Sequence, residues 1–483
     1  MFFNSIDFAI FFPIVFILYW LVSQKLFLRN LLVLVASYVF YGWWDWRFLL
    51  LIVISSLVDF IVGQKLYKSE NLKQRKGLLS ISLIVNLGFL VYFKYTNFFI
   101  DTFVDSFRLF GKELEISTLN IILPVGISFY TFQTLSYTID IYRKQLKPTK
   151  NWLAFFSFVA FFPQLVAGPI ERASHLLPQF YKTYKFNYNL VKSGLLLMAF
   201  GLFKKMVIAD RAAILVNQVY NNPTDYHGYE TILATVLFAF QIYCDFSGYS
   251  DIAIGAARTM GFDLMKNFDS PYFSKSITEF WRRWHISLST WFRDYVYIPL
   301  GGSRNGKYRT YANLFIVFVV SGLWHGAAMT FVVWGAIHGF IIVLEKVLTK
   351  YRKKIFTSKN HFLNYFLAIP LTFIIVCFAW IFFRANSFND AMIVINNSFI
   401  FPPFSLDNIL SKEFDRREYW VLIVAIVILL LKDFIDRNDK WIENLNKLNI
   451  VFRWLIYLVI VLSIIFYGQY GDDTPAEFIY FQF

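Results

Sequence analysis

Apolar runs long enough to cross a lipid bilayer recur along the whole chain. A membrane-spanning helix needs about 20 mainly apolar residues, and 57% of this chain is hydrophobic while only 16% is charged. Soluble proteins carry about 25% charged residues. The composition therefore excludes a disordered protein, a coiled coil and a disulfide scaffold, and it argues against a soluble enzyme. Candidate spans lie near residues 8–23, 30–45, 48–64, 78–98, 119–141, 152–168, 189–208, 229–244, 312–330, 331–346, 363–384, 418–431 and 451–468.

Several of these runs are short for a full crossing, so we expect some of them to be re-entrant or tilted. We predict an all-α, polytopic integral membrane protein with about 11 transmembrane helices, supplemented by re-entrant and interfacial helices. No long linker and no internal repeat divides the sequence. We therefore expect a single domain over residues 1–483.

The basic loops predict the orientation of the chain. The net charge is +14, and the cations gather in short loops between apolar runs, where they mark the cytosolic side. This distribution favours a role in orientation over nucleic-acid binding. The first apolar stretch precedes its cations Lys25 and Arg29, which is the reverse of a secretory signal. We expect an uncleaved first span with the N-terminus outside, cytosolic loops at 65–76, 143–150 and 346–359, and external segments at 99–118, 385–417 and 469–483.

Residues 274–300 combine tryptophan, arginine and histidine in a pattern typical of one interfacial helix. Ser276 and Glu279 have capping-box spacing, and Pro299 would end the helix. An apolar stripe beside arginines favours a helix that lies along the membrane surface. It is either a plain surface helix or, because His285 lies at the edge of the stripe, part of a site. The stripe consists of Trp281, Trp284, Leu288, Trp291 and Tyr295, and the arginines are Arg282, Arg283 and Arg293.

His325 lies in an apolar stretch without acid, lysine or arginine between Arg309 and Glu345. Ionisable groups inside a bilayer are costly and tend to mark a site. Burial would keep the imidazole uncharged, and a neutral imidazole takes a proton from an alcohol that attacks an acyl carbonyl. The alternative is a packing histidine that donates to a backbone carbonyl, which is the interpretation we favour for His338.

Other kinds of site find little support in the sequence. It contains no Gly-x-Ser-x-Gly nucleophile elbow and no glycine motif for phosphate or dinucleotide binding. The histidines lack metal-ligand spacing, so we expect no zinc site. Cys244 and Cys377 lie in apolar surroundings and predict no disulfide framework. Asp245 and Asp251, in or beside an apolar run, either shape a polar tunnel or pair with cations of the Arg-rich helix.

Three long motifs lie around His285 and His325. Residues 280–289 read Phe-Trp-Arg-Arg-Trp-His-Ile-Ser-Leu-Ser, residues 294–302 read Asp-Tyr-Val-Tyr-Ile-Pro-Leu-Gly-Gly, and residues 322–327 read Gly-Leu-Trp-His-Gly-Ala. These motifs resemble the membrane-bound O-acyltransferase family, and most of all its bacterial alginate O-acetyltransferase branch. The resemblance runs over nearly the whole chain. Shorter motifs that fit the same pattern lie at 162–163, 167–170, 267–268, 271–272 and 383–386.

This resemblance implies a many-helix fold around a central tunnel, with His325 as the catalytic residue and His285 lining the same site. It implies transfer of acetyl groups from cytosolic acetyl-CoA, without a bound cofactor, to an exported or cell-envelope polysaccharide such as alginate. It implies the bacterial inner membrane, with its lipids, and a separate extracytoplasmic esterase-like acetyltransferase as partner. The expected tunnel or donor-binding residues are Trp281, Arg282, Arg283, Trp284, Arg293, Trp324 and Asp245.

The C-terminal segment adds one more resemblance. Residues 478–483 read Phe-Ile-Tyr-Phe-Gln-Phe and are similar to the end of the small peptide of the teichoic acid D-alanylation system, where a tyrosine is assigned the role of acyl carrier. The corresponding hypothesis is that Tyr480 carries the acyl group here and that His325 activates its phenol. The alternative is an aromatic membrane anchor.

Two other classes of function stay open at this point. A polysaccharide transporter or flippase would have repeated halves around a midplane site, and a structural scaffold for a polysaccharide synthase would tolerate the loss of His325. Within acyl transfer, the alternative acceptor is peptidoglycan or another wall polymer.

Overall fold

The predicted apolar runs fold into helices. The computed structural model describes residues 1–108, 111, 118–166, 168–349, 362, 364–401, 403, 414–435, 441–470 and 478–479, and within them it contains helices but no β-strand. The all-helical, multi-pass prediction is confirmed, while the count of crossings stays a prediction. In this described part, the helical stretches long and apolar enough to cross a membrane are Leu26–Lys68, Leu72–Arg108, Tyr229–Thr259, Met329–Val347, Phe366–Arg384 and Ile450–Tyr467.

The chain forms two units, each with its own core. Unit 1 comprises Met1–Leu195 and Ala253–Met265, and unit 2 comprises Leu196–Ile252 and Lys266–Phe483. The chain passes between the units three times: inside α10 (Tyr188–Leu202), inside α12 (Tyr229–Thr259), and between Met265 and Lys266 after α12. A single domain over 1–483 stays a prediction.

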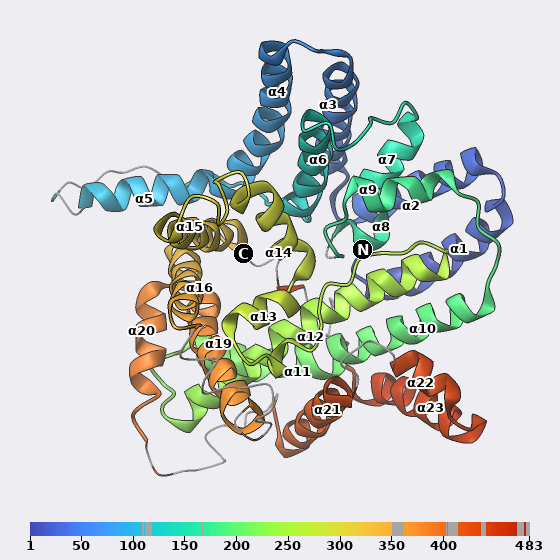
Figure 1. Ribbon diagram of the computed structural model, residues 1–483. Helices are drawn as coiled ribbons and strands as arrows, with labels where there is room; N and C mark the ends of the chain where they lie inside the picture. Colours follow the sequence, from blue (N-terminus) through green and yellow to red (C-terminus); the bar gives the residue numbers. More distant parts are fainter. Residues whose placement is uncertain are drawn as a thin grey trace. The chain divides into compact units, whose positions relative to one another are not determined.

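Three helices of unit 1 are joined by buried polar contacts. They are α3 (Leu49–Lys68), α4 (Leu72–Leu90) and α6 (Ile127–Tyr142), which lie side by side (Figure 1). Asp59 of α3 is fully buried and accepts hydrogen bonds from Ser82 and Asn86 of α4 and from Thr138 of α6. Such bonds hold helices together inside a membrane. The other helices of unit 1 are α1 (Ile6–Val22), α2 (Leu26–Asp45), η1 (Trp46–Phe48), η2 (Val91–Tyr95), α5 (Thr96–Arg108), α7 (Trp152–Ala160), α8 (Phe162–Leu165), α9 (Ala173–Leu176) and η3 (Leu177–Tyr181).

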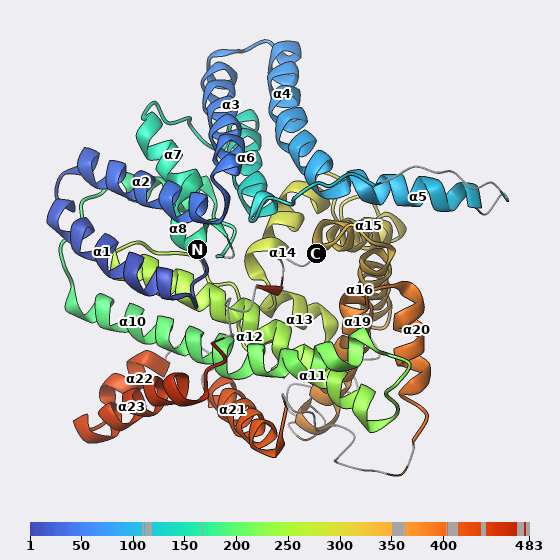
Figure 2. The same cartoon turned by 180° about the vertical axis from the view of Figure 1, so that it is seen from behind.

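A tightly packed helical hairpin carries His325 in unit 2. Its helices are α15 (Lys307–His325) and α16 (Met329–Val347), which are adjacent in both views (Figures 1 and 2). A Cβ added to Gly322 would lie 2.2 Å from the carbonyl oxygen of Phe331. Only glycine therefore permits this approach. The other helices of unit 2 are η4 (Phe203–Ala209), α11 (Asp210–Asn221), η5 (Pro271–Phe273), α13 (Ile277–Arg283), α14 (Ile286–Phe292), η6 (Arg293–Tyr297), η7 (Asn364–Ala368), α19 (Ile369–Arg384), α20 (Phe388–Asn397), α21 (Arg416–Ile435), α22 (Trp441–Lys447) and α23 (Ile450–Tyr467).

The expected single helix over residues 274–300 is wrong, because the segment breaks at His285. This residue has φ 44° and ψ 55°, which is left-handed backbone, and it separates α13 from α14. Asn267 stabilises the break: the Ile286 N–H donates to its backbone oxygen at 2.9 Å, and the Ser287 hydroxyl donates to its side-chain oxygen at 2.9 Å. The predicted start is confirmed, since Ser276 Oγ accepts the Glu279 N–H at 3.0 Å.

Candidate active site

Two buried imidazoles lie next to each other in unit 2. His325 is the last residue of α15, and its ring centroid lies 6.2 Å from that of His285. The exposed fractions of the two residues are 5% and 2%. Aromatic rings surround them: the ring centroid of Trp334 lies 5.1 Å from that of His325, and the ring centroid of Phe246 lies 4.5 Å from that of His285. The structure thus brings together, from distant parts of the sequence, the two histidines that the motifs single out.

The surroundings of His285 favour an uncharged ring. It lies between two seven-residue helices, outside the membrane-length stretches. Burial and the neighbouring His325 hold the pKa of the His285 imidazole well below its ordinary value. The ring is therefore uncharged at neutral pH.

A cavity of about 250 Å³ opens between α13, α14 and α15. Arg282 and Arg293 line it, and both residues are exposed. The buried Ser321, which precedes His325 by one turn of α15, also lines it. Neither catalytic-candidate histidine is among its lining residues. The cavity is mainly apolar with two cations at its wall. Its lining consists of Thr278, Trp281, Arg282, Leu288, Ser289, Phe292, Arg293, Tyr297, Leu314, Val317, Phe318, Ser321 and Ile342.

Trp281, a predicted tunnel residue, lines this cavity from α13. Its indole N–H donates to His338 Nδ1 at 3.3 Å, and His338 is fully buried. The Trp334 ring also contacts His338, with ring centroids 5.1 Å apart. These contacts agree with the packing role favoured for His338.

Three other predicted site residues do not line the cavity. Arg283 pairs with Glu279 at 2.9 Å and donates to the Asp269 carbonyl at 3.2 Å, so it holds its own segment in place. Trp284 is buried, with its ring 5.2 Å from that of Trp380. Trp324 precedes His325 in α15 and is half-buried. Their proposed tunnel or donor roles stay predictions.

The acids of α12 pair with two lysines that the sequence analysis did not single out. Lys205 Nζ lies 2.7 Å from Asp245 Oδ1, and Lys204 Nζ lies 2.6 Å from Asp251 Oδ2. The alternative in which these acids pair with the Arg-rich segment is therefore wrong. Close helix packing allows the pairing, because a Cβ on Gly201 would lie only 2.6 Å from the Gly248 carbonyl oxygen. The sequence held one signal for this pairing. Lys204 and Lys205 are adjacent inside the predicted span 189–208, and charged side chains in an apolar span need partners.

Residues 478–479 lie against the acids of α12 and the rings beside them. Phe478 and Ile479 are buried, and the Phe478 ring lies 5.6 Å from Phe246 and 4.6 Å from Tyr249. The Ile479 N–H donates to Asp245 Oδ2 at 2.6 Å. The short dark red fragment in Figures 1 and 2 marks these two residues. Tyr480 lies outside the described residues. Phe478, two residues before it in the sequence, contacts the same phenylalanine ring as His285.

Comparisons with known proteins identify the family of the chain. Residues 146–389 match the membrane-bound O-acyltransferase family. The "probable alginate O-acetylase AlgI" of Pseudomonas putida is 37% identical over 99% of both chains. The chain belongs to the membrane-bound O-acyltransferase family. This acyltransferase is also 32% identical to a peptidoglycan O-acetyltransferase of Helicobacter pylori, over 97% of this chain and 94% of the relative. A teichoic acid D-alanyltransferase of Bacillus subtilis is 30% identical over 56% of this chain and 71% of its own.

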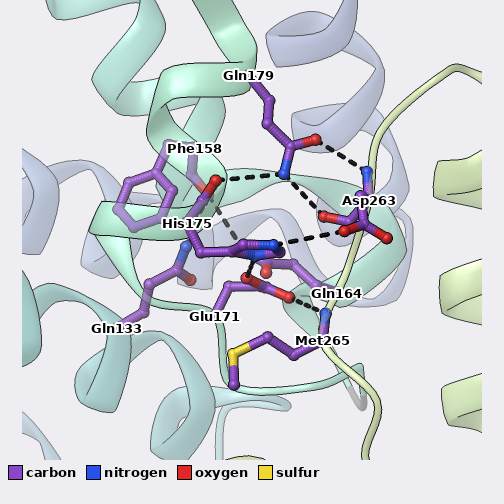
Figure 3. A network of polar contacts seen from close by, with 8 residues as sticks. All are labelled: Gln133, Phe158, Gln164, Glu171, His175, Gln179, Asp263 and Met265. Atoms are coloured by element: carbon purple, nitrogen blue, oxygen red, sulfur yellow. Dashed lines mark hydrogen bonds and ion pairs between the residues drawn. The ribbon is translucent and has the colours of Figure 1, made fainter.

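A second polar cluster of the acyltransferase lies in unit 1 (Figure 3). His175 bridges the buried Glu171, at 2.8 Å, and Asp263, at 3.5 Å. Hydrogen bonds to Asp263 and Glu171 raise the pKa of His175 to about 10, so this ring is a cation at neutral pH rather than a base. Gln179 adds bonds to the backbone of Asp263. The cluster ties α9 and η3 to the segment after α12. Within the described residues, no group of three or more His, Cys, Asp or Glu side chains could hold a metal ion.

Proposed function

We propose that this acyltransferase moves acetyl groups from cytosolic acetyl-CoA across the bacterial inner membrane for O-acetylation of an exported or cell-envelope polysaccharide. The proposal rests above all on the two buried imidazoles, whose ring centroids lie 6.2 Å apart, with Phe478 packed against the Phe246 ring that contacts His285. The names of the relatives support an alginate-like acceptor first, and peptidoglycan second.

The proposed chemistry passes through an ester on Tyr480. His325 takes the phenol proton as the phenolate oxygen attacks the thioester carbonyl. The C–O bond forms, the C–S bond breaks, and His325 returns the proton to the leaving thiolate. The products are an aryl acetate and free coenzyme A, and the imidazole is neutral again. His285 lines the same space, and the surrounding rings exclude the water that would hydrolyse the thioester.

The donor would approach through the cavity between α13, α14 and α15. Arg282 and Arg293 supply cations for the donor phosphates, and Trp281 supplies an apolar wall. Arg283 is engaged by Glu279 and does not line the cavity, so we assign it a supporting role. With both termini outside, the acetyl ester would then pass from Tyr480 to an extracytoplasmic esterase-like acetyltransferase that acts on the polysaccharide.

Replacing His325 tests this function. In a host that acetylates its envelope, we expect His325→Ala to keep normal membrane levels and to lower alkali-released acetate by about 100-fold or more. Acetate is measured separately from the exported polysaccharide and from peptidoglycan, which distinguishes the acceptors. His338→Gln is the matched control, because it also removes a buried imidazole beside Trp334, and folded protein should retain transfer. Unchanged acetylation in His325→Ala contradicts the proposal.

Mass spectrometry of the C-terminal peptide tests the relay. With the downstream transferase deleted, we expect an acetyl group on Tyr480 that is absent in Tyr480→Phe and in His325→Ala. If only unmodified Tyr480 is found, the ester intermediate is wrong, and an aromatic anchor becomes the better interpretation of the segment.

A further inference from the structure

The turn of helix around Lys205 and Met206 holds the C-terminal segment at two points. At the first, the Met206 carbonyl accepts the Gln469 N–H at 3.0 Å, directly after α23. Arg211, one turn further on, donates to the Tyr467 carbonyl at 2.5 Å. At the second point, Lys205 binds Asp245, which binds Ile479. The chain therefore leaves this turn at residue 469 and returns to it at residue 479.

One carboxylate joins the lysine to the segment. Lys205 Nζ lies 2.7 Å from Asp245 Oδ1 and 2.8 Å from Asp210 Oδ1, while Asp245 Oδ2 accepts the Ile479 N–H at 2.6 Å. The side chains of all three charged residues are at least nine-tenths buried. Charge-assisted bonds of this kind are the strong ones, and burial makes them hard to exchange for water. The ammonium thus fixes the carboxylate, and the carboxylate fixes the backbone at Ile479.

The same segment is also held by a side chain. The Phe478 ring packs between Phe246 and Tyr249, which are one and four residues after Asp245 on α12. Tyr480 directly follows Ile479 in the sequence. The Phe246 ring in turn lies 4.5 Å from the His285 ring, centroid to centroid. A clamp at 478–479 therefore holds the two residues before Tyr480 next to a ring that contacts His285.

We propose that Lys205, Asp245 and Asp210 form a clamp of positioning residues that seats the C-terminal segment of this chain at the histidine pair. The clamp recognises the segment through the Ile479 amide and the Phe478 ring, and it deepens the function proposed above, since it rests on Tyr480 being the acyl carrier. It assigns to Lys205 and Asp210 a role that the sequence motifs did not indicate.

Lys204 provides a matched control. It neighbours Lys205 in η4, is also buried, and pairs with an acid of α12, but its partners are Ser247 and the half-buried Asp251. Lys204→Met therefore removes a buried lysine and its ion pair without touching the carboxylate that holds Ile479.

Carboxypeptidase digestion of the full-length protein in nanodiscs, followed by mass spectrometry, measures the clamp without any acyl transfer. Digestion of the wild type and of Lys204→Met should stop before Ile479. In Lys205→Met and Asp245→Leu, removal of Ile479 should be about ten-fold faster or more, because a charge-assisted bond is lost. Asp245→Asn keeps an acceptor oxygen and should restore protection relative to Asp245→Leu.

The outcomes separate the clamp from general damage and from the relay. Wild-type protection in Lys205→Met or Asp245→Leu overturns the clamp, and so does equal exposure in Lys204→Met. If Lys205→Met does not fold, the comparison of Asp245→Leu with Asp245→Asn decides. Repeating the digestion in Tyr480→Phe should leave protection unchanged. If Ile479 is protected but Tyr480 carries no acetyl group, the clamp is supported and the relay is wrong. If Tyr480 is acetylated normally in a variant whose Ile479 is not protected, the relay is supported and the role of the clamp in seating the segment for acyl transfer is wrong.

Discussion

Residue identity marks His285 as a candidate site residue but does not indicate its backbone conformation. The Arg-Arg-Trp-His motif marks the residue in the sequence, and its neighbour in space, His325, is marked by an apolar run without other charges. The left-handed backbone of His285 could not be predicted, because it depends on Asn267, which caps α14 from outside the motif. A non-glycine residue in this region costs about 1–2 kcal/mol. Such strain gathers at functional sites, where the surrounding structure enforces it.

The left-handed backbone at His285 leads to separate predictions for stability and for activity. Because glycine adopts positive φ without cost, we expect His285→Gly to be about 1 kcal/mol more stable than His285→Ala. Both variants should transfer less acetate, since neither carries the imidazole. Thermal unfolding in detergent and alkali-released acetate measure the two effects. Equal stability of the variants would show that the backbone at residue 285 relaxes.

At the scale of elements, hydropathy located the helices but not their breaks and pairings. The runs at 312–330 and 331–346 correspond to α15 and α16, and the run at 451–468 corresponds to α23. The break at His285 was missed because aromatic residues at three- and four-residue steps fit one helix as well as two short ones. The pairing of Lys205 with Asp245 was missed because it joins two helices whose approach depends on Gly201 and Gly248.

The α15–α16 hairpin makes a prediction about glycine. In Gly322→Ala the new methyl group would meet the Phe331 carbonyl, so we expect a loss of about 1–3 kcal/mol in stability and weaker activity through displacement of His325. Gly77→Ala in α4 is the contrasting variant. It has no heavy atom within 4 Å of the added Cβ, and we expect a gain of up to about 1 kcal/mol. Similar melting temperatures for the two variants would contradict close packing of the hairpin.

At the scale of the whole molecule, composition sufficed for a helical multi-pass protein, and the motifs sufficed for the family. The sequence could not place the C-terminal segment, because contacts made by a backbone amide leave no pattern in residue types. The basic loops predict an orientation that depends on no contact at all.

Cysteine labelling tests that orientation. Cys244 and Cys377 are both buried, so the wild type should react little with a membrane-impermeant maleimide. Asn389→Cys, in the predicted external segment, should be labelled on intact cells, whereas Lys147→Cys should be labelled only after the membrane is permeabilised. Both positions are exposed. The reverse pattern would invert the predicted topology.

The bond between Asp245 and Ile479 joins residues 234 positions apart. During translation, α12 leaves the ribosome long before residues 478–479 exist, so the clamp cannot close until nearly every other helix has been made. A chain interrupted shortly after α23 would still contain both histidines and all the labelled helices of the described part, but not the residues that the proposed clamp holds. Under the relay proposed above it would also lack Tyr480, so the order of synthesis itself would delay acyl transfer until the helices around the histidines have been made.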